Sequence, residues 1–125
     1  FTFSDPAESA FLGWHAYTLG FGGYLRWGNN SWPVRPCQDS RFITWSSGDC
    51  FLAYPTGSSI RMERLVEGIQ AFEKLRILAP TLTPAQQKLL DHALDPFRPV
   101  AYDTSTDAAV AVNQAKAVLK KISGK

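Results

Sequence analysis

Hydrophobic residues recur at helical spacing in four segments of this 125-residue chain. The first segment opens at Asp5-Pro6, where a carboxylate can accept N–H bonds from the first helical turn and proline suits the first helical position. Gly20 supplies the left-handed residue that commonly follows a helix. The pattern predicts a helix between these points, with one apolar face made of Ala7, Ala10, Phe11, Trp14 and Thr18.

The second segment is the strongest helix prediction in the chain. Ser58 or Ser59 stands at its start as a cap, and the pattern ends near Leu78, just before Pro80. Charged residues occupy the opposite side. The expected apolar face comprises Met62, Leu65, Val66, Ile69, Phe72 and Leu75.

Two shorter helices are predicted after this one. Thr83 begins the capping-box sequence Thr-Pro-Ala-Gln, and the helix that follows ends near Asp95-Pro96. The last helix begins near Thr106. Its apolar stripe consists of Ala108, Ala111, Ala115, Val118, Leu119 and Ile122.

The pattern changes between the first two helices. Tyr24–Trp27 is a short aromatic run bounded by glycines, which predicts a strand of the kind found in parallel sheets. Residues 28–50 form an unusually long loop, and such loops in compact domains are usually functional. Phe51–Tyr54 is expected to be a second short extended piece, ended by a proline and glycine turn.

The order helix, strand, loop, helix is typical of one step of a (β/α)8 barrel. We therefore predict an α/β fold: the C-terminal segment of such a barrel (last strand, long loop, last helix) followed by two extra helices, so that most residues are helical. We predict that residues 1–79 are the barrel part and that residues 80–125 are a helical extension. The two helices of this extension would either cover the outside of the barrel or form a separate α-helical hairpin. A single strand lacks hydrogen-bonding neighbours, so we expect pairing with upstream chain, with Phe51–Tyr54 or with another copy.

Composition places the candidate chemistry early in the chain. Thirteen of the 16 aromatic residues, but only seven of the 24 charged residues, lie before residue 55. The net charge of +2 is too small for the clustered basic face of a nucleic-acid binder, and no apolar run approaches the ~20 residues of a membrane-spanning helix. We therefore expect neither a nucleic acid nor a membrane as a partner. His15 and His92 are remote from the cysteines, so neither a metal site nor a cofactor is predicted.

Cys37 and Cys50 fall in the same loop region. They would form a disulfide if the protein is exported, and would be two free thiols otherwise. The chain opens at Phe1-Thr2-Phe3 as though it were cut from a longer protein, which we expect to be secreted or periplasmic.

The aromatic loop favours a saccharide as its ligand. Trp27 and Trp32 offer flat rings that stack on the apolar faces of a sugar, and Asn30 can bind hydroxyl groups. These three residues would otherwise form an aromatic plug at the barrel rim, with the amide bonded to the turn backbone. Asp39 and Arg41 either bind further hydroxyls or hold the loop in shape by pairing with Arg35 or with the backbone.

The sequence also resembles a known family. The resemblance is carried by FLGWHAYTLGFGGYLRWGNNSW, DSRFITWSSGDCFLAYP and SSIRMERLVEGIQAFEKLRIL. These runs are similar to the C-terminal part of the catalytic domain of glycoside hydrolase family 123, and to a related bacterial domain of unknown function. The similarity covers roughly residues 1–79.

The resemblance implies an exo-acting β-N-acetylgalactosaminidase. In that family the acetamido oxygen of the substrate attacks the anomeric carbon, and an adjacent Asp-Glu pair steadies this group and serves as acid and base. This chain has no Asp-Glu dipeptide, so no catalytic residue is assigned and the pair is expected upstream. The resemblance makes Gly23–Trp27 the eighth strand and Ser59–Leu78 the eighth helix of the barrel. A non-catalytic carbohydrate-binding or interaction domain is the alternative.

Overall fold

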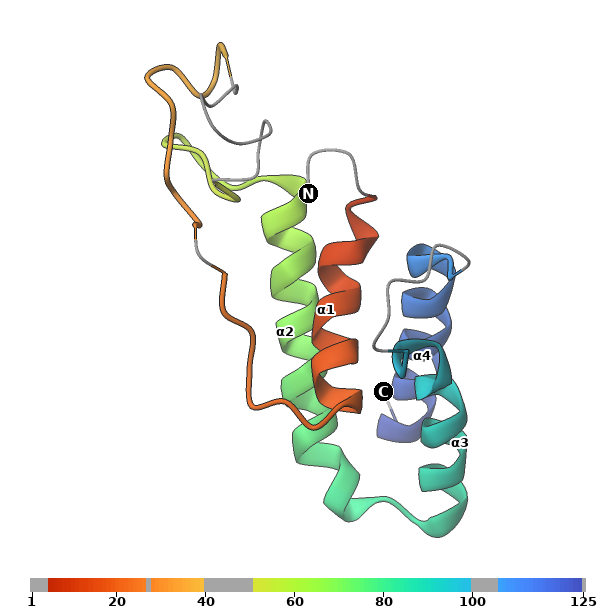
Figure 1. Cartoon of the computed structure of the whole chain (residues 1–125). Helices are drawn as coiled ribbons and strands as arrows, with labels where there is room; N and C mark the ends of the chain where they lie inside the picture. Colours follow the sequence, from red (N-terminus) through yellow and green to blue (C-terminus); the bar gives the residue numbers. More distant parts are fainter. Residues whose placement is uncertain (1–4, 27, 40–50, 100–105, 125) are drawn as a thin grey trace.

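The computed structural model describes residues 5–26, 28–39, 51–99 and 106–124, and its regular structure there is helical (Figure 1). The expected helices are present as α1 (Ala7–Thr18), α2 (Ile60–Leu78), α3 (Pro84–Leu94) and α4 (Ala108–Ser123). Short 3-10 turns follow α2 and α3, at Ala79–Thr81 (η1) and Asp95–Phe97 (η2). The prediction of a mostly helical chain is confirmed.

Local chemistry sets the helix ends where the sequence indicated. The Ser59 hydroxyl accepts the amide of Met62 at 3.1 Å at the start of α2. Thr83 and Gln86 form the reciprocal capping box of α3. Gly20, just beyond α1, has a φ of 71°, a left-handed conformation that glycine adopts without steric cost.

α1 and α2 lie side by side and run in the same direction (Figure 1). Their contacts advance together along both helices, because Ala10 and Gly13 meet Gly68, and the ring of Tyr17 meets that of Phe72. A Cβ atom at Gly13 would lie 2.1 Å from the carbonyl oxygen of Gly68, so the backbones approach as closely as they do only because glycine is present. The connecting segment must return along the length of the helices, as a barrel strand does.

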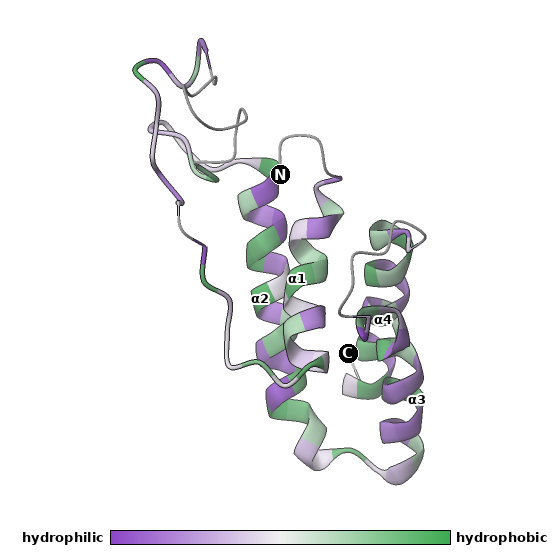
Figure 2. Ribbon diagram, viewed as in Figure 1, coloured by the Kyte–Doolittle hydropathy of each residue, from purple (hydrophilic) through white to green (hydrophobic). Residues whose placement is uncertain are grey.

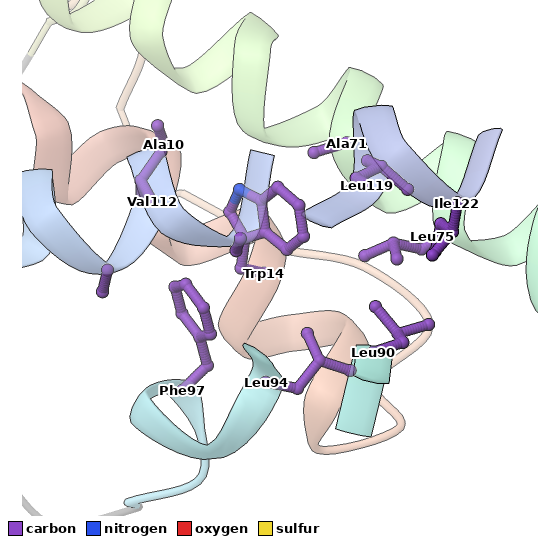
Figure 3. Packing of buried hydrophobic residues seen from close by; sticks show 12 residues of the cluster. Ala10, Trp14, Ala71, Leu75, Leu90, Leu94, Phe97, Val112, Leu119 and Ile122 are labelled. Atoms are coloured by element: carbon purple, nitrogen blue, oxygen red, sulfur yellow. The ribbon is translucent and has the colours of Figure 1, made fainter. Parts of the chain in front are cut away.

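One hydrophobic cluster draws on all four helices and on η2 (Figure 3). Trp14 is fully buried within it, and its ring centroid lies 5.7 Å from that of Phe97. His15 Nδ1 donates to the carbonyl oxygen of Phe97 at 2.7 Å, which joins α1 to η2. α3 and α4 therefore pack onto α1 through a shared core. Its residues are Ala10, Trp14, Ala71, Leu75, Leu90, Leu94, Phe97, Ala111, Val112, Ala115, Leu119 and Ile122.

The buried face of α2 differs from the predicted apolar face. Leu65 and Leu75 are buried as expected, but they share this face with Gly68 and Ala71, whereas Ile69 is 52% exposed. The small residues turn their side of the helix towards α1 because they let the two backbones meet. The residues of the predicted face that remain half-buried or exposed are Met62, Val66, Ile69 and Phe72.

The strand predicted at Tyr24–Trp27 is not formed in the described residues. Tyr24, Leu25 and Arg26 have no regular structure, and Trp27 lies outside the described part. Leu25 is 94% exposed. Figure 2 shows that the segment between the end of α1 and the loop carries both hydrophobic and hydrophilic residues. A strand needs a neighbour that satisfies its N–H and C=O groups, and the described chain supplies no neighbouring strand to these residues.

Candidate functional site

The predicted sugar-binding loop lies at the end of the helical layer where α1 and α2 begin (Figure 1). The part of the predicted loop (28–50) that the structure describes is residues 28–39. We count residues 51–59, which lead from it into α2, as a second part of the loop. In a (β/α)8 barrel each helix begins on the side where the loops after the strands gather, and active sites are built from those loops. The loop thus lies on the side where such a fold carries its site.

Backbone bonds join the two described parts of the loop. Asn30 and Phe51 form an isolated antiparallel bridge, and the carbonyl oxygen of Asn29 accepts the Leu52 amide at 2.9 Å. Phe51 and Leu52 are 3% and 1% exposed, so they anchor the loop in the protein. The extended piece predicted at Phe51–Tyr54 is reduced to single bridges, because the partner chain turns away after one residue pair.

Trp32 is an exposed aromatic residue held on this frame. Its indole Nε1 donates to the carbonyl oxygen of Ala53 at 2.7 Å, which fixes the ring while the residue stays 40% exposed. Asn30 is also exposed and lies two positions earlier in the chain. The exposed part of the ring is open to a ligand in this structure, and the sugar-binding and plug roles both stay predictions.

Tyr54 belongs beside these residues, although it was absent from the predicted site. Its ring meets that of Phe51 edge to face, with centroids 5.2 Å apart. Its backbone pairs with Gly57 through hydrogen bonds of 2.8 and 3.2 Å, which closes the turn. The signal in the sequence was the Tyr54-Pro55 pair at the end of the loop, which the family resemblance includes.

Ser59 connects the loop to α2. Its hydroxyl donates to the carbonyl oxygen of Leu52 and accepts the amide of Met62. A single side chain therefore caps the helix and holds the buried anchor of the loop. The geometry of the loop depends on the start of α2 for this reason.

Asp39 lies on a separate turn of the loop. The amides of Gln38 and Asp39 donate to the carbonyl oxygen of Arg35 at 3.0 and 2.8 Å. The guanidinium group of Arg35 also donates to Gln38 Oε1 at 3.4 Å. Asp39 is exposed. The bond to Arg35 is made by its backbone amide and does not involve the carboxylate, so both roles considered for that side chain stay predictions.

Three residues singled out in the sequence lie outside the described part of the chain. These are Trp27, Arg41 and Cys50, so the roles expected of the first two stay predictions. Cys37 is exposed, with its Sγ 3.9 Å from Oγ1 of Thr56. Cys37 is a free cysteine in this structure. The disulfide with Cys50 and the two free thiols stay the two alternatives, because Cys50 lies outside the described part.

Two side chains of the helical layer have shifted pKa values. Burial, with the carboxylate of Asp91 nearby, raises the pKa of Tyr17. Burial also acts to raise the pKa of Glu67, but hydrogen bonds and charge from Lys116 and Arg64 outweigh it and hold that pKa below its ordinary value. Both side chains lie on helices, Tyr17 between α1 and α2 and Glu67 between α2 and α4.

The chemistry offered by the described loop is stacking and hydrogen bonding. An indole ring can cover the apolar face of a sugar, and an amide can bind its hydroxyl groups. Within the described ranges, no three His, Cys, Asp or Glu side chains converge on a space that could hold a metal ion. No helix in those ranges combines the length and the apolar character needed to cross a membrane.

A comparison with known protein families finds a match. A family model described as "Glycoside hydrolase 123, catalytic domain" matches residues 1–78. The matched range contains α1, the loop and α2, and it ends where η1 begins. The match confirms the resemblance drawn from the sequence. No curated protein matches the chain.

Proposed function

The chain belongs to the glycoside hydrolase 123 catalytic-domain family, and from this premise we propose that it forms the closing part of a carbohydrate-hydrolysing domain. In the proposal, α1 is the seventh helix of a (β/α)8 barrel and α2 is the eighth. Tyr24–Trp27 becomes the last strand when the other strands, from chain outside these residues, lie beside it. The family match is the observation that carries the hydrolase assignment.

The arrangement of α1 and α2 supports the barrel proposal. Two neighbouring helices that run in the same direction need a connection that crosses back between them, and in barrels that connection contains a strand. Here the glycine contact between Gly13 and Gly68 fixes the pair as direct neighbours. The loop emerges at the end of the pair where a barrel carries its site.

Uncovered apolar side chains support the same proposal. Leu25 is 94% exposed, Phe21 is 53% exposed and Ile69 is 52% exposed. The first two belong to the returning segment, and the third belongs to the predicted apolar face of α2. In the proposal a sheet would cover such side chains, and burying a large aliphatic or aromatic side chain is worth about 1.5–3 kcal/mol.

Trp32 and Asn30 are the described residues proposed to contact the sugar. Trp32 would stack on the apolar face of the ring, and Asn30 would bind a hydroxyl group. Trp27 and Arg41 join them in the proposal on their sequence positions alone, and Asp39 supports the loop or binds a further hydroxyl. The proposed substrate is a terminal β-linked N-acetylgalactosamine, whose acetamido group attacks the anomeric carbon.

In this mechanism the chain binds and orients, while the acid and base come from outside residues 1–125. The pair expected in the family is an adjacent Asp-Glu, which this sequence lacks. The chain on its own should therefore bind the sugar weakly and leave glycosidic bonds intact. A secreted or periplasmic location for the complete protein is part of the proposal.

The test is hydrolysis of 4-nitrophenyl β-N-acetylgalactosaminide by the complete protein that carries this chain. We expect turnover of this substrate and none of the matching galactoside, which has no acetamido group. Trp32→Ala should lower kcat/KM about tenfold, the equivalent of one stacking contact of ~1.4 kcal/mol. Val34→Ala, at a 98% exposed position of the same loop, is the matched control and should keep full activity.

Two outcomes would contradict the proposal in different ways. Absence of turnover on any glycoside would reject the hydrolase. Saturable sugar binding that depends on Trp32 without turnover would favour the alternative, a non-catalytic carbohydrate-binding domain.

A further inference from the structure

A groove runs between α2 and α4, with α1 as its floor. Its volume is about 550 Å³, within the about 300–1,000 Å³ typical of small-ligand sites. Trp14 lies at the floor, Glu67, Gln70 and Lys74 line it from α2, and Lys116 and Lys120 line it from α4. None of the residues predicted for the sugar site takes part, so this groove is separate from the loop.

The groove carries an excess of positive charge. The Glu67 carboxylate is already paired on both oxygens, with Lys116 Nζ at 2.7 Å and Arg64 Nη1 at 2.7 Å. Among the residues that the structure describes, no carboxylate pairs with Lys74 or Lys120. Two ammonium groups thus line one groove, one from each wall, without an ion-pair partner among the described residues.

We propose that this groove binds the anionic group of an acidic oligosaccharide, either a sulfate ester or a carboxylate. That the ligand is a saccharide rests on the proposed function. That it carries an anionic group is inferred from the lysines of the groove. Ammonium groups on opposite walls can both donate to one oxyanion, and such charge-assisted bonds are stronger than neutral ones. The amide of Gln70 lies in the same groove and can bind a neighbouring hydroxyl.

The groove lies far enough from the loop to hold a different part of the sugar chain. The residues of α2 that line the groove, from Glu67 to Lys74, are 7 to 14 residues beyond the start of α2 at Ile60, which corresponds to about 10–21 Å of helix. A monosaccharide cannot reach both places. The proposed ligand therefore spans several sugar units or is a second molecule.

Glu67 provides a specific prediction because it competes with the ligand for Lys116. The ion pair between them crosses the groove from one wall to the other. Glu67→Gln removes the competing carboxylate and leaves Lys116 available, so it should strengthen anion binding severalfold. If the groove only packs the helices together, Glu67→Gln should leave the binding of anions to the chain unchanged.

The experiment is a calorimetric titration of the full chain with three tetrasaccharides: chondroitin sulfate, hyaluronan and uncharged chitotetraose. We expect the two acidic sugars to bind and the uncharged one to fail. Both acidic sugars carry glucuronate carboxylates, and chondroitin sulfate carries sulfate groups in addition. Stronger binding of chondroitin sulfate therefore identifies sulfate as the preferred group, and equal binding of the two identifies carboxylate. The double variant Lys74→Ala, Lys120→Ala should weaken binding about tenfold or more.

The matched control is Lys88→Ala with Lys121→Ala, which removes the same charge from exposed positions outside the groove. It should keep the affinity of the unmodified chain. Equal weakening by both double variants, tighter binding of inorganic tripolyphosphate than of either acidic sugar, or equal binding of chitotetraose would each overturn the proposal. Because no turnover is measured, a failure here is distinct from a failure of the proposed hydrolase.

Discussion

The contact between α1 and α2 predicts the sign of the stability change in Gly13→Ala. Helix propensity alone would make this variant more stable, whereas the close packing of the two helices would make it less stable. Gly13→Ala adds one methyl group in the middle of α1. In an isolated helix this change is favourable by about 1 kcal/mol, because alanine has the higher helix propensity. In the packed pair, the new Cβ would lie 2.1 Å from the carbonyl oxygen and 2.3 Å from the carbonyl carbon of Gly68.

The size of the expected loss follows from these distances. Ordinary van der Waals contact begins at 3.4 Å, so the two helices must separate locally by about 1 Å. The obstacle is backbone and cannot rotate away, and overpacking of this kind costs about 1–3 kcal/mol. Set against the propensity gain of about 1 kcal/mol, this leaves a net loss of about 1 kcal/mol, which lowers the melting temperature by roughly 3–5 °C in a chain of this size.

Thermal unfolding followed by far-UV circular dichroism measures this loss. Gly22→Ala is the control, because a Cβ there would meet nothing within 4 Å, and it should be neutral or slightly stabilising. A Gly13→Ala variant that melts at a higher temperature than the unmodified chain would refute the close parallel packing of α1 and α2, and with it the main structural support for the barrel proposal.

Four further predictions concern stability, pH and association. Trp14→Ala should lower the free energy of unfolding, measured by chemical denaturation, by about 3–5 kcal/mol, because it removes a fully buried ring. Trp14→Phe keeps an aromatic ring in the core and should cost markedly less. Because the pKa of Glu67 is lowered in the fold, its ion pairs contribute their full stabilisation above pH 4.5, the ordinary pKa of this group. This contribution is lost as the pH falls through the lowered pKa. Denaturation at neutral and acidic pH should therefore show a smaller loss of stability on acidification in Glu67→Gln than in the unmodified chain. Thr83→Ala should cost about 1 kcal/mol of thermal stability by removing the cap of α3. The isolated chain should self-associate in light scattering, and the exposed-site variant Leu25→Lys should reduce this; a clean monomer would count against the uncovered apolar side.

The helix boundaries were predictable because capping is local chemistry. Ser59 and Thr83 each bond an amide only three positions away, and the positive φ of Gly20 depends on its own lack of a side chain. The orientation of α2 was not predictable in the same way. Its buried side is decided by the contact of Gly68 with Ala10, which is 58 residues distant, and no periodicity within the helix contains that information.

The strand prediction failed for a different physical reason. The aromatic pattern at Tyr24–Trp27 indicates that these side chains suit the partly buried surface of a sheet. A strand forms only if its backbone N–H and C=O groups also find hydrogen-bonding partners. The described chain lacks such partners beside Tyr24–Arg26. The same pattern would be satisfied by a sheet contributed from other residues of a catalytic domain.

The candidate site was predictable in part. Asn30 and Trp32 stood out because they are neighbours in an aromatic sequence. The contributions of Tyr54 and Ser59 depend on how the loop closes, through the bond between Trp32 and Ala53 and the burial of Leu52. These contacts join residues about 20 positions apart, and sequence spacing alone does not reveal them.

The most direct test of the central claim is amide hydrogen exchange at Tyr24, Leu25 and Arg26, measured in this chain and in the complete protein that carries it. If these residues become the last strand of a barrel, their amides exchange rapidly in the isolated chain and are strongly protected in the complete protein. Rapid exchange in both would contradict the account, because the segment would then have no sheet to join.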